Sequence, residues 1–76
     1  MDRLITMSTF VKVAQAGGFS AAARALNTSP SYVTRQVQRL ERLLGVRLLN
    51  RTTRSVCLTE VGTNYYERCV RILAEL

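Results

Sequence analysis

The residues with the clearest chemistry lie in one segment, Asn27–Leu44, with the sequence NTSPSYVTRQVQRLERLL. At the helical spacing of 100° per residue, this segment separates into two faces. One face is apolar and consists of Val33, Val37, Leu40 and Leu44. The opposite face offers hydrogen-bonding groups and positive charge, from Ser31, Arg35, Gln38, Arg39 and Arg42. A helix that is anchored on one side and cationic on the other is suited to the major groove of DNA.

The charge of the chain also favours a polyanionic partner. Its 76 residues include 11 basic and 5 acidic side chains, for a net charge of +6. Ten of the basic residues are arginines, whose planar guanidinium binds phosphate or guanine through two hydrogen bonds. Between Arg35 and Arg54 there are six arginines and one acid, Glu41. This clustering creates a local field that attracts nucleic acid.

Several other classes of protein are disfavoured. The chain has no histidine and only two cysteines, Cys57 and Cys69, which argues against a structural zinc site. No apolar run approaches the ~20 residues that cross a bilayer, so we expect a cytoplasmic protein with both cysteines reduced and buried. Without a phosphate-binding glycine loop or paired carboxylates placed for acid–base chemistry, an enzyme is not expected.

The elements that must position the basic face are short helices. Apolar residues recur at helical spacing from Leu4 to Ala16, and Gly17-Gly18 ends that helix. Ser20 is expected to cap a second helix, whose three alanines allow close packing. Asn27-Thr28 makes a bend, after which Ser29 caps the third helix with Pro30 at its first position. Two helices joined by so short a turn form a helix-turn-helix.

A hairpin and a last helix are expected after Gly45. Alternation at Val46 and Leu48, and again at Val56 and Leu58, predicts two short strands with a basic tip between them. Thr59 is expected to cap the last helix, with Glu60 in its first turn. An apolar stripe follows that helix to the end of the chain and predicts both a partner helix and a longer protein; it consists of Val61, Tyr65, Cys69, Ile72, Leu73 and Leu76.

Four strings in this order, FSAAARAL, SPSYVTRQVQRLE, LGVRLLNRTTR and LTEVG, resemble the N-terminal domain of LysR-type transcriptional regulators. The resemblance implies a mainly α fold, a winged helix-turn-helix of three helices plus a two-stranded β-hairpin wing over residues 1–58. The helix-turn-helix would span about 19–44 and the wing about 46–58, followed by a long linker helix at 59–76. The family implies a homodimer on double-stranded DNA, no cofactor in this fragment, and an effector-binding C-terminal domain absent from this chain.

The resemblance also implies which residues contact DNA. By position, the candidates on the recognition helix are Pro30, Ser31, Thr34 and Arg35, and those on the wing are Arg51, Thr53 and Arg54. Dimerisation is expected through the linker helix, at Tyr65, Cys69, Ile72, Leu73 and Leu76. The chain departs from the family pattern at Pro30, where Gln is frequent, and at Tyr32, where Ala is frequent. The missing Gln removes a side chain that pairs with adenine.

Alternatives remain open for individual residues. Arg35 is expected to contact a base or a phosphate, and Thr34 to contact a base or only to position the helix. Gln38 is expected to reach a base or a phosphate. Arg39 and Arg42 are expected to bind phosphate or to form an ion pair with Glu41. Tyr32 either contacts DNA or packs against the first helix, and Tyr65 lies in the core or the dimer seam.

Two other functions would use the same basic surface. A protein-interaction module would bind an acidic partner through the third helix and would bind random duplex DNA weakly or not at all. An RNA-binding domain would need exposed aromatic side chains for stacking, whereas most of the five aromatic residues lie at core spacing. Both are less consistent with the sequence than binding to double-stranded DNA.

Overall fold

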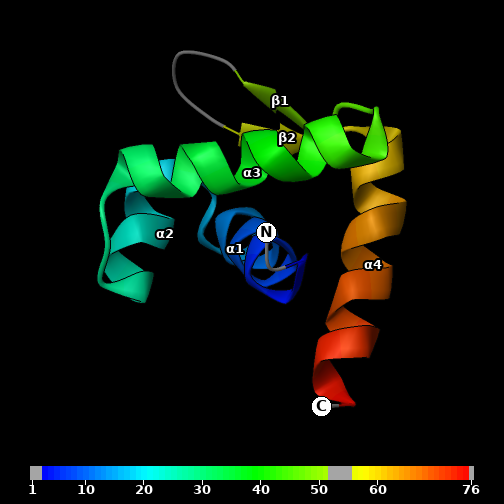
Figure 1. Ribbon diagram of the computed structural model, residues 1–76, viewed down its shortest axis with the longest axis horizontal. Helices are drawn as coiled ribbons and strands as arrows, with labels where there is room; N and C mark the ends of the chain where they lie inside the picture. The colour runs from blue at the N-terminus through cyan, green and yellow to red at the C-terminus, as the bar shows by residue number, and fades with distance from the viewer. Residues whose placement is uncertain (1–2, 52–55, 76) are drawn as a thin grey trace.

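Four helices and a hairpin make up the part of the chain that the computed structural model describes, residues 3–51 and 56–75 (Figure 1). In chain order they are α1 (Arg3–Ala16), α2 (Phe19–Leu26), α3 (Pro30–Leu44), β1 (Leu49–Arg51), β2 (Val56–Leu58) and α4 (Glu60–Ala74). The two strands pair antiparallel, with Leu49 opposite Leu58. The predicted order of three helices, a hairpin and a last helix is confirmed.

The core forms around α1, which packs against α2, α3 and α4. Phe10 and Val13 of α1 are fully buried, as are three residues of α3: Val33, Val37 and Leu40. Leu44 was expected on this apolar face but is 38% exposed, because it ends α3 beside Gly45 at the surface. Gln36 takes part in the buried side of the helix instead.

The turns before and after α3 are formed by the residues that were predicted to form them. Asn27 has φ 57°, the left-handed conformation that Asn tolerates, and ends α2. The Ser29 hydroxyl accepts a hydrogen bond from the Tyr32 N–H at 3.2 Å, and Pro30 occupies the first turn. Gly45, with φ 72°, ends α3 and donates its N–H to the Glu41 carbonyl at 2.8 Å. The predicted boundaries of α3 are confirmed.

Two predicted boundaries are wrong. Helix α2 begins at Phe19 rather than after Ser20, because the Gly18 carbonyl already accepts the Ala22 N–H and Phe19 packs against the core. The hairpin strands also begin later than Val46. The Val46 N–H bonds to the Glu41 carbonyl in the turn after α3, and the Leu48 N–H bonds to the Glu41 carboxylate. Neither residue therefore takes part in the strand ladder.

The start of α4 packs closely on the segment that precedes β1. The Thr59 hydroxyl accepts the Gly62 N–H at 2.9 Å, which confirms the predicted cap. Gly62 lies directly against the Leu48 backbone, and a Cβ at position 62 would overlap the Leu48 carbonyl oxygen. Only glycine allows this approach of helix to backbone.

Replacing Gly62 with alanine is expected to lower the free energy of unfolding by ~1–3 kcal/mol, because backbone must move to admit the methyl group. Urea denaturation followed by circular dichroism measures the change. Gly18→Ala is the matched control, since its φ of 177° suits any residue and a Cβ there meets no atom within 4 Å. Equal losses in the two variants would contradict the contact.

The two cysteines differ in environment. Cys69 is fully buried, as expected, whereas Cys57 on β2 is exposed, contrary to the expectation that both are buried. Strand β2 turns alternate side chains outward, and Cys57 falls on the outer side between Val56 and Leu58. Burial raises the pKa of the Cys69 thiol, which keeps it protonated at neutral pH.

A thiol-specific chromogenic reagent is therefore expected to modify Cys57 rapidly in the native chain at neutral pH and Cys69 only after denaturation. The raised pKa and the burial of Cys69 both suppress the reactive thiolate. Counting released chromophore before and after adding denaturant measures the two steps. Simultaneous modification of both thiols in the native chain would contradict this arrangement.

Candidate nucleic-acid interface

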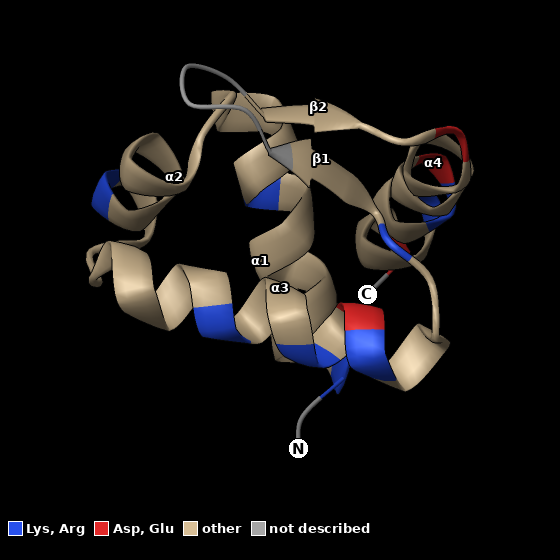
Figure 2. Cartoon of the chain, turned by 90° about the horizontal axis from the view of Figure 1, so that it is seen from above, with Lys and Arg blue, Asp and Glu red and all other residues tan. Residues whose placement is uncertain are grey.

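The polar face of α3 is exposed along the length of the helix. All of the residues predicted for this face are exposed to solvent: Ser31, Arg35, Gln38, Arg39 and Arg42. Viewed from above, the basic segments of α3 follow one outer side of the helix, and a further basic segment lies in the loop that leads to β1 (Figure 2). The structure thus brings the predicted donors and cations together on one surface.

Hydrogen bonds within the first turn preorganise this end of α3. The Thr34 hydroxyl donates to the Pro30 carbonyl at 2.9 Å, and the hydroxyls of Ser29 and Ser31 lie 3.3 Å apart. The Thr34 hydroxyl proton is thus used within the helix, which leaves its oxygen as an acceptor and its methyl group for apolar contact. Pro30 and Ser31 are exposed at the start of the helix.

Tyr32 differs from its neighbours in the first turn. Its side chain is half-buried and lines an open groove of about 380 Å³ that is largely apolar. The other residues lining the groove come from α1 and from the end of α2 with its turn: Leu4, Ile5, Ser8, Thr9, Leu26 and Thr28. Of the two alternatives for Tyr32, this placement favours packing against the first helix over a contact with DNA.

Of the wing, the structure describes only the two strands β1 and β2. Asn50 pairs with Cys57 and Arg51 with Val56 in the backbone ladder. The Arg51 side chain, Thr53 and Arg54 lie outside the described residues. Their predicted contacts with DNA therefore stay predictions, whereas the hairpin that carries them is confirmed.

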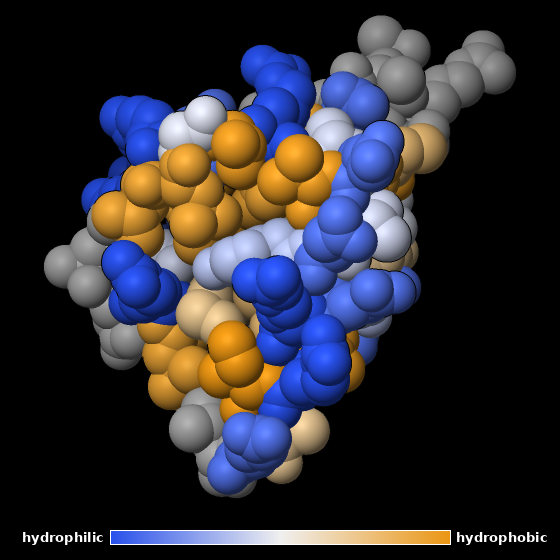
Figure 3. All heavy atoms as spheres, turned by 90° about the vertical axis from the view of Figure 1, so that its right-hand side faces the viewer, coloured by the Kyte–Doolittle hydropathy of each residue, from blue (hydrophilic) through white to orange (hydrophobic). Residues whose placement is uncertain are grey.

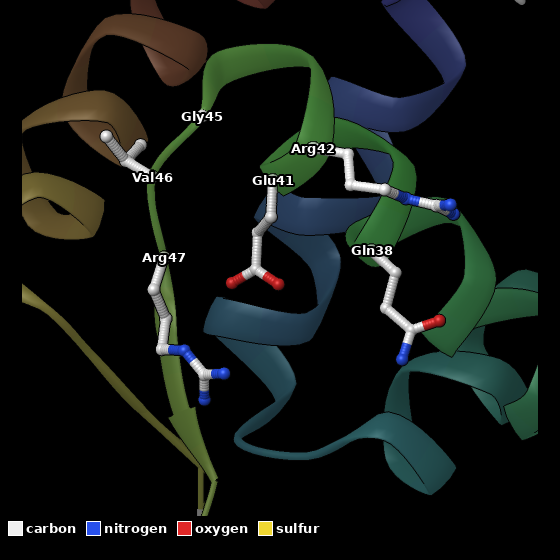
Figure 4. Close-up of a pocket in the computed structure, with 6 residues that line it drawn as sticks. All are labelled: Gln38, Glu41, Arg42, Gly45, Val46 and Arg47. Carbon is white, nitrogen blue, oxygen red and sulfur yellow. The ribbon is translucent and has the colours of Figure 1, made fainter.

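Arg47 is a basic residue of this surface that was not among the predicted DNA contacts. It is exposed and, with Gln38 and Arg42, lines an open hollow of about 660 Å³ between the end of α3 and the loop before β1. In Figure 4 the Arg47 guanidinium and the Gln38 amide flank the Glu41 carboxylate. The signal in the sequence was an arginine directly after the Gly45 turn, within the basic cluster.

The Glu41 carboxylate bonds to the backbone of the segment that leads to β1. One of its oxygens accepts the Leu48 N–H at 2.8 Å and the Leu49 N–H at 3.2 Å. The Arg42 side chain extends away from this carboxylate (Figure 4). Arg39 and Arg42 are both exposed, so a phosphate can reach them.

The residues predicted for dimerisation divide between the core and the surface. Tyr65 packs on Phe10, with ring centroids 5.9 Å apart, and Cys69 has no exposed surface. Cys69 therefore offers no surface to a second chain in this structure, in which α1 packs against α4. Leu73 is half-buried against the core, Ile72 is 48% exposed, and Leu76 lies outside the described residues.

Other apolar side chains reach the surface near these residues. Figure 3 shows hydrophobic atoms among hydrophilic ones on the face at the α4 side of the molecule. On α4 itself, Val61 is 48% exposed and Val70 37% exposed, and at the end of α3 Leu43 is 45% exposed. Together with Ile72, these side chains form apolar surface that is exposed to water in the single chain.

Two kinds of site have no representative in the described part of the chain. Among residues 3–51 and 56–75 there is no cluster of three His, Cys, Asp or Glu side chains that would bind a metal. None of the helices described here has the length and apolar character needed to cross a membrane.

Similar proteins include regulators whose sequences align with the entire chain. The transcriptional repressor PA14_22550 of Pseudomonas aeruginosa is 49% identical over 76 residues, and the transcriptional activator AaeR of Escherichia coli is 51% identical over 76 residues. The chain spans about a quarter of the length of these relatives, 24% and 25% respectively.

Solved structures with the same fold include two complexes with DNA. The CbnR_DBD–DNA complex superposes with a TM-score of 0.92 at 42% identity, over 97% of this chain and 84% of that one. The BenM_DBD/catB site 1 DNA complex superposes with a TM-score of 0.93 at 33% identity, over 99% and 83%. The predicted winged helix-turn-helix is confirmed by these superpositions.

A family model described as "Bacterial regulatory helix-turn-helix protein, lysR family" matches residues 4–63. The match begins in α1, includes α2, α3 and the hairpin, and ends in the first turn of α4. The chain therefore belongs to the lysR family of bacterial regulatory helix-turn-helix proteins.

Proposed function

We propose that this chain is the DNA-binding domain of a bacterial transcriptional regulator and that it recognises double-stranded DNA by sequence. The observation that carries the proposal is the exposed polar and basic face of α3, held on a fold that superposes on domains bound to DNA. A regulator of the chromosome acts in the cytoplasm and needs no catalytic group.

The dimensions of α3 suit the major groove. Its 15 residues span ~22 Å, and a helix of ordinary width fits a groove ~12 Å wide. The first two turns, from Ser31 to Gln38, reach base edges, with Arg35 at their centre. Arginine forms two hydrogen bonds with the O6 and N7 atoms of guanine, which gives this position its discrimination.

Phosphate contacts orient the domain on the duplex. Arg39, Arg42 and Arg47 lie further along α3 and in the loop after it, where a helix crossing the groove meets the backbone. The positive end of the α3 dipole near Pro30 favours another phosphate. At the hairpin, Arg51, Thr53 and Arg54 are proposed to contact the adjacent backbone or minor groove.

A homodimer is proposed to bind an operator of two half-sites. Exposed apolar surface on α4 supports pairing through this helix, with Ile72 its most accessible predicted residue. No metal or cofactor takes part in DNA binding in this proposal. A small-molecule effector, if the full-length protein binds one, binds outside these 76 residues.

Arg35→Ala is expected to lower affinity for the preferred duplex by ~1–3 kcal/mol and to relax preference at one base pair. Fluorescence anisotropy with the preferred duplex and its single-base-pair variants measures both effects. Arg71→Ala, which removes the same charge from an exposed position on α4, is the control. An equal loss on every duplex would assign Arg35 to a phosphate instead.

Affinity is also expected to fall steeply with salt, because arginines that bind phosphates displace condensed counterions. If a dimer neutralises ~6 phosphates, the slope of log affinity against log salt concentration is about −5. Titrations on a palindromic duplex at several concentrations of potassium chloride give this slope. A slope near zero would rule out a binding mode dominated by the arginine surface.

A further inference from the structure

Residues 47–49 lead from the turn after α3 into β1, and the Glu41 side chain of α3 bonds to their backbone. The Glu41 carboxylate accepts the N–H groups of Leu48 and Leu49 through a single oxygen, at 2.8 and 3.2 Å. Hydrogen bonds to a charged acceptor are stronger than those between neutral groups. The Glu41 side chain lies in the hollow between the end of α3 and the loop before β1 (Figure 4).

The same backbone segment is held from the other side by the start of α4. The Thr59 hydroxyl donates to the Arg47 carbonyl at 2.7 Å, and the Thr59 N–H donates to the Leu48 carbonyl at 3.0 Å. Gly62 closes against that carbonyl. The N–H groups of residues 48 and 49 thus point to α3, and the carbonyls of residues 47 and 48 point to α4.

Among the residues that the structure describes, Glu41 is the α3 side chain that hydrogen-bonds to this segment. Between Gly45 and Arg47 the connecting loop is exposed, and Val46 has 38% of its surface in water. Buried contacts of Leu48 and Leu49 hold the segment against the core but are non-directional. The two hydrogen bonds to Glu41 are directional, so they fix the angle between α3 and the hairpin.

That angle matters for a protein that contacts two grooves of one duplex. A phosphate backbone separates the major groove from the adjacent minor groove, so α3 and the hairpin must straddle it at a set distance. Binding is strongest when the protein already holds this arrangement, since no ordering is then required on association.

We propose that Glu41 is a positioning residue for DNA recognition, which holds α3 and the hairpin at the spacing that lets both contact the same duplex. The inference rests on the proposed function. Glu41 would thus favour specific binding even though it is an acid within the basic surface and its negative charge repels phosphate.

Two substitutions separate position from charge. Glu41→Asp keeps the charge but withdraws the carboxylate by one methylene group, so it no longer reaches both N–H groups. Glu41→Gln removes the charge but keeps an oxygen at the original distance. Glu67→Asp and Glu67→Gln, at an exposed site on α4, are the matched controls. Each 76-residue variant is titrated with the duplex preferred by the unmodified chain and with random duplex, at a temperature where it is folded.

Glu41→Asp is expected to lose about ten-fold or more in affinity for the preferred duplex while its affinity for random duplex is unchanged. Glu41→Gln, which keeps an acceptor oxygen in place, is expected to retain more affinity for the preferred duplex than Glu41→Asp does. In native-state hydrogen exchange, the Leu48 and Leu49 amides are expected to exchange faster in Glu41→Asp than in Glu41→Gln. A role in stability alone would leave the ratio of the two affinities unchanged in the folded variant.

The proposal is overturned if Glu41→Asp binds like the unmodified chain, or if it loses affinity equally on both duplexes. Failure of Glu41→Asp to fold would also overturn it, because Glu41 would then serve the fold rather than its orientation on DNA. If the unmodified chain shows no preference between any selected duplex and random duplex, the proposed function itself fails, and that outcome is visible before any variant is made.

Discussion

Helix α3 has to bury one side against α1 while keeping the other side in water, and the remaining elements are arranged around this requirement. Burial of Val33, Val37 and Leu40 contributes ~1.5–3 kcal/mol for each side chain, a large share of the net stability of a small domain. The same contact fixes the rotation of the helix about its axis. The polar face from Ser31 to Arg42 therefore points outward in a defined direction, which a helix that reads base edges requires.

The junction after α3 carries this orientation to the rest of the molecule. Residues 47–49 bond to Glu41 on one side and to Thr59 at the start of α4 on the other. Gly62 allows the two segments to approach without a side chain between them. Glu41, an acid within the most basic part of the chain, thus links the recognition helix to the segment that enters the hairpin, and Thr59 links that segment to the last helix.

The features that were predicted from sequence depend on local chemistry. Ser29, Pro30 and Gly45 set the ends of α3 through capping and backbone preference, and helical spacing was enough to identify its exposed face. Long-range contacts were not accessible in this way. The backbone partners of Glu41, and the groove that Tyr32 lines together with α1, each depend on residues distant in sequence, which periodicity does not specify.

Selection from a pool of random duplexes tests the central claim, that the exposed face of α3 reads DNA sequence, most directly. A defined sequence arranged as two half-sites is expected to be enriched, because each protomer of a dimer places one recognition helix on the duplex. Recovery of sequences that remain random after repeated rounds, despite binding to the pool, would contradict this claim, since the arginine surface would then provide only non-specific attraction to the phosphate backbone.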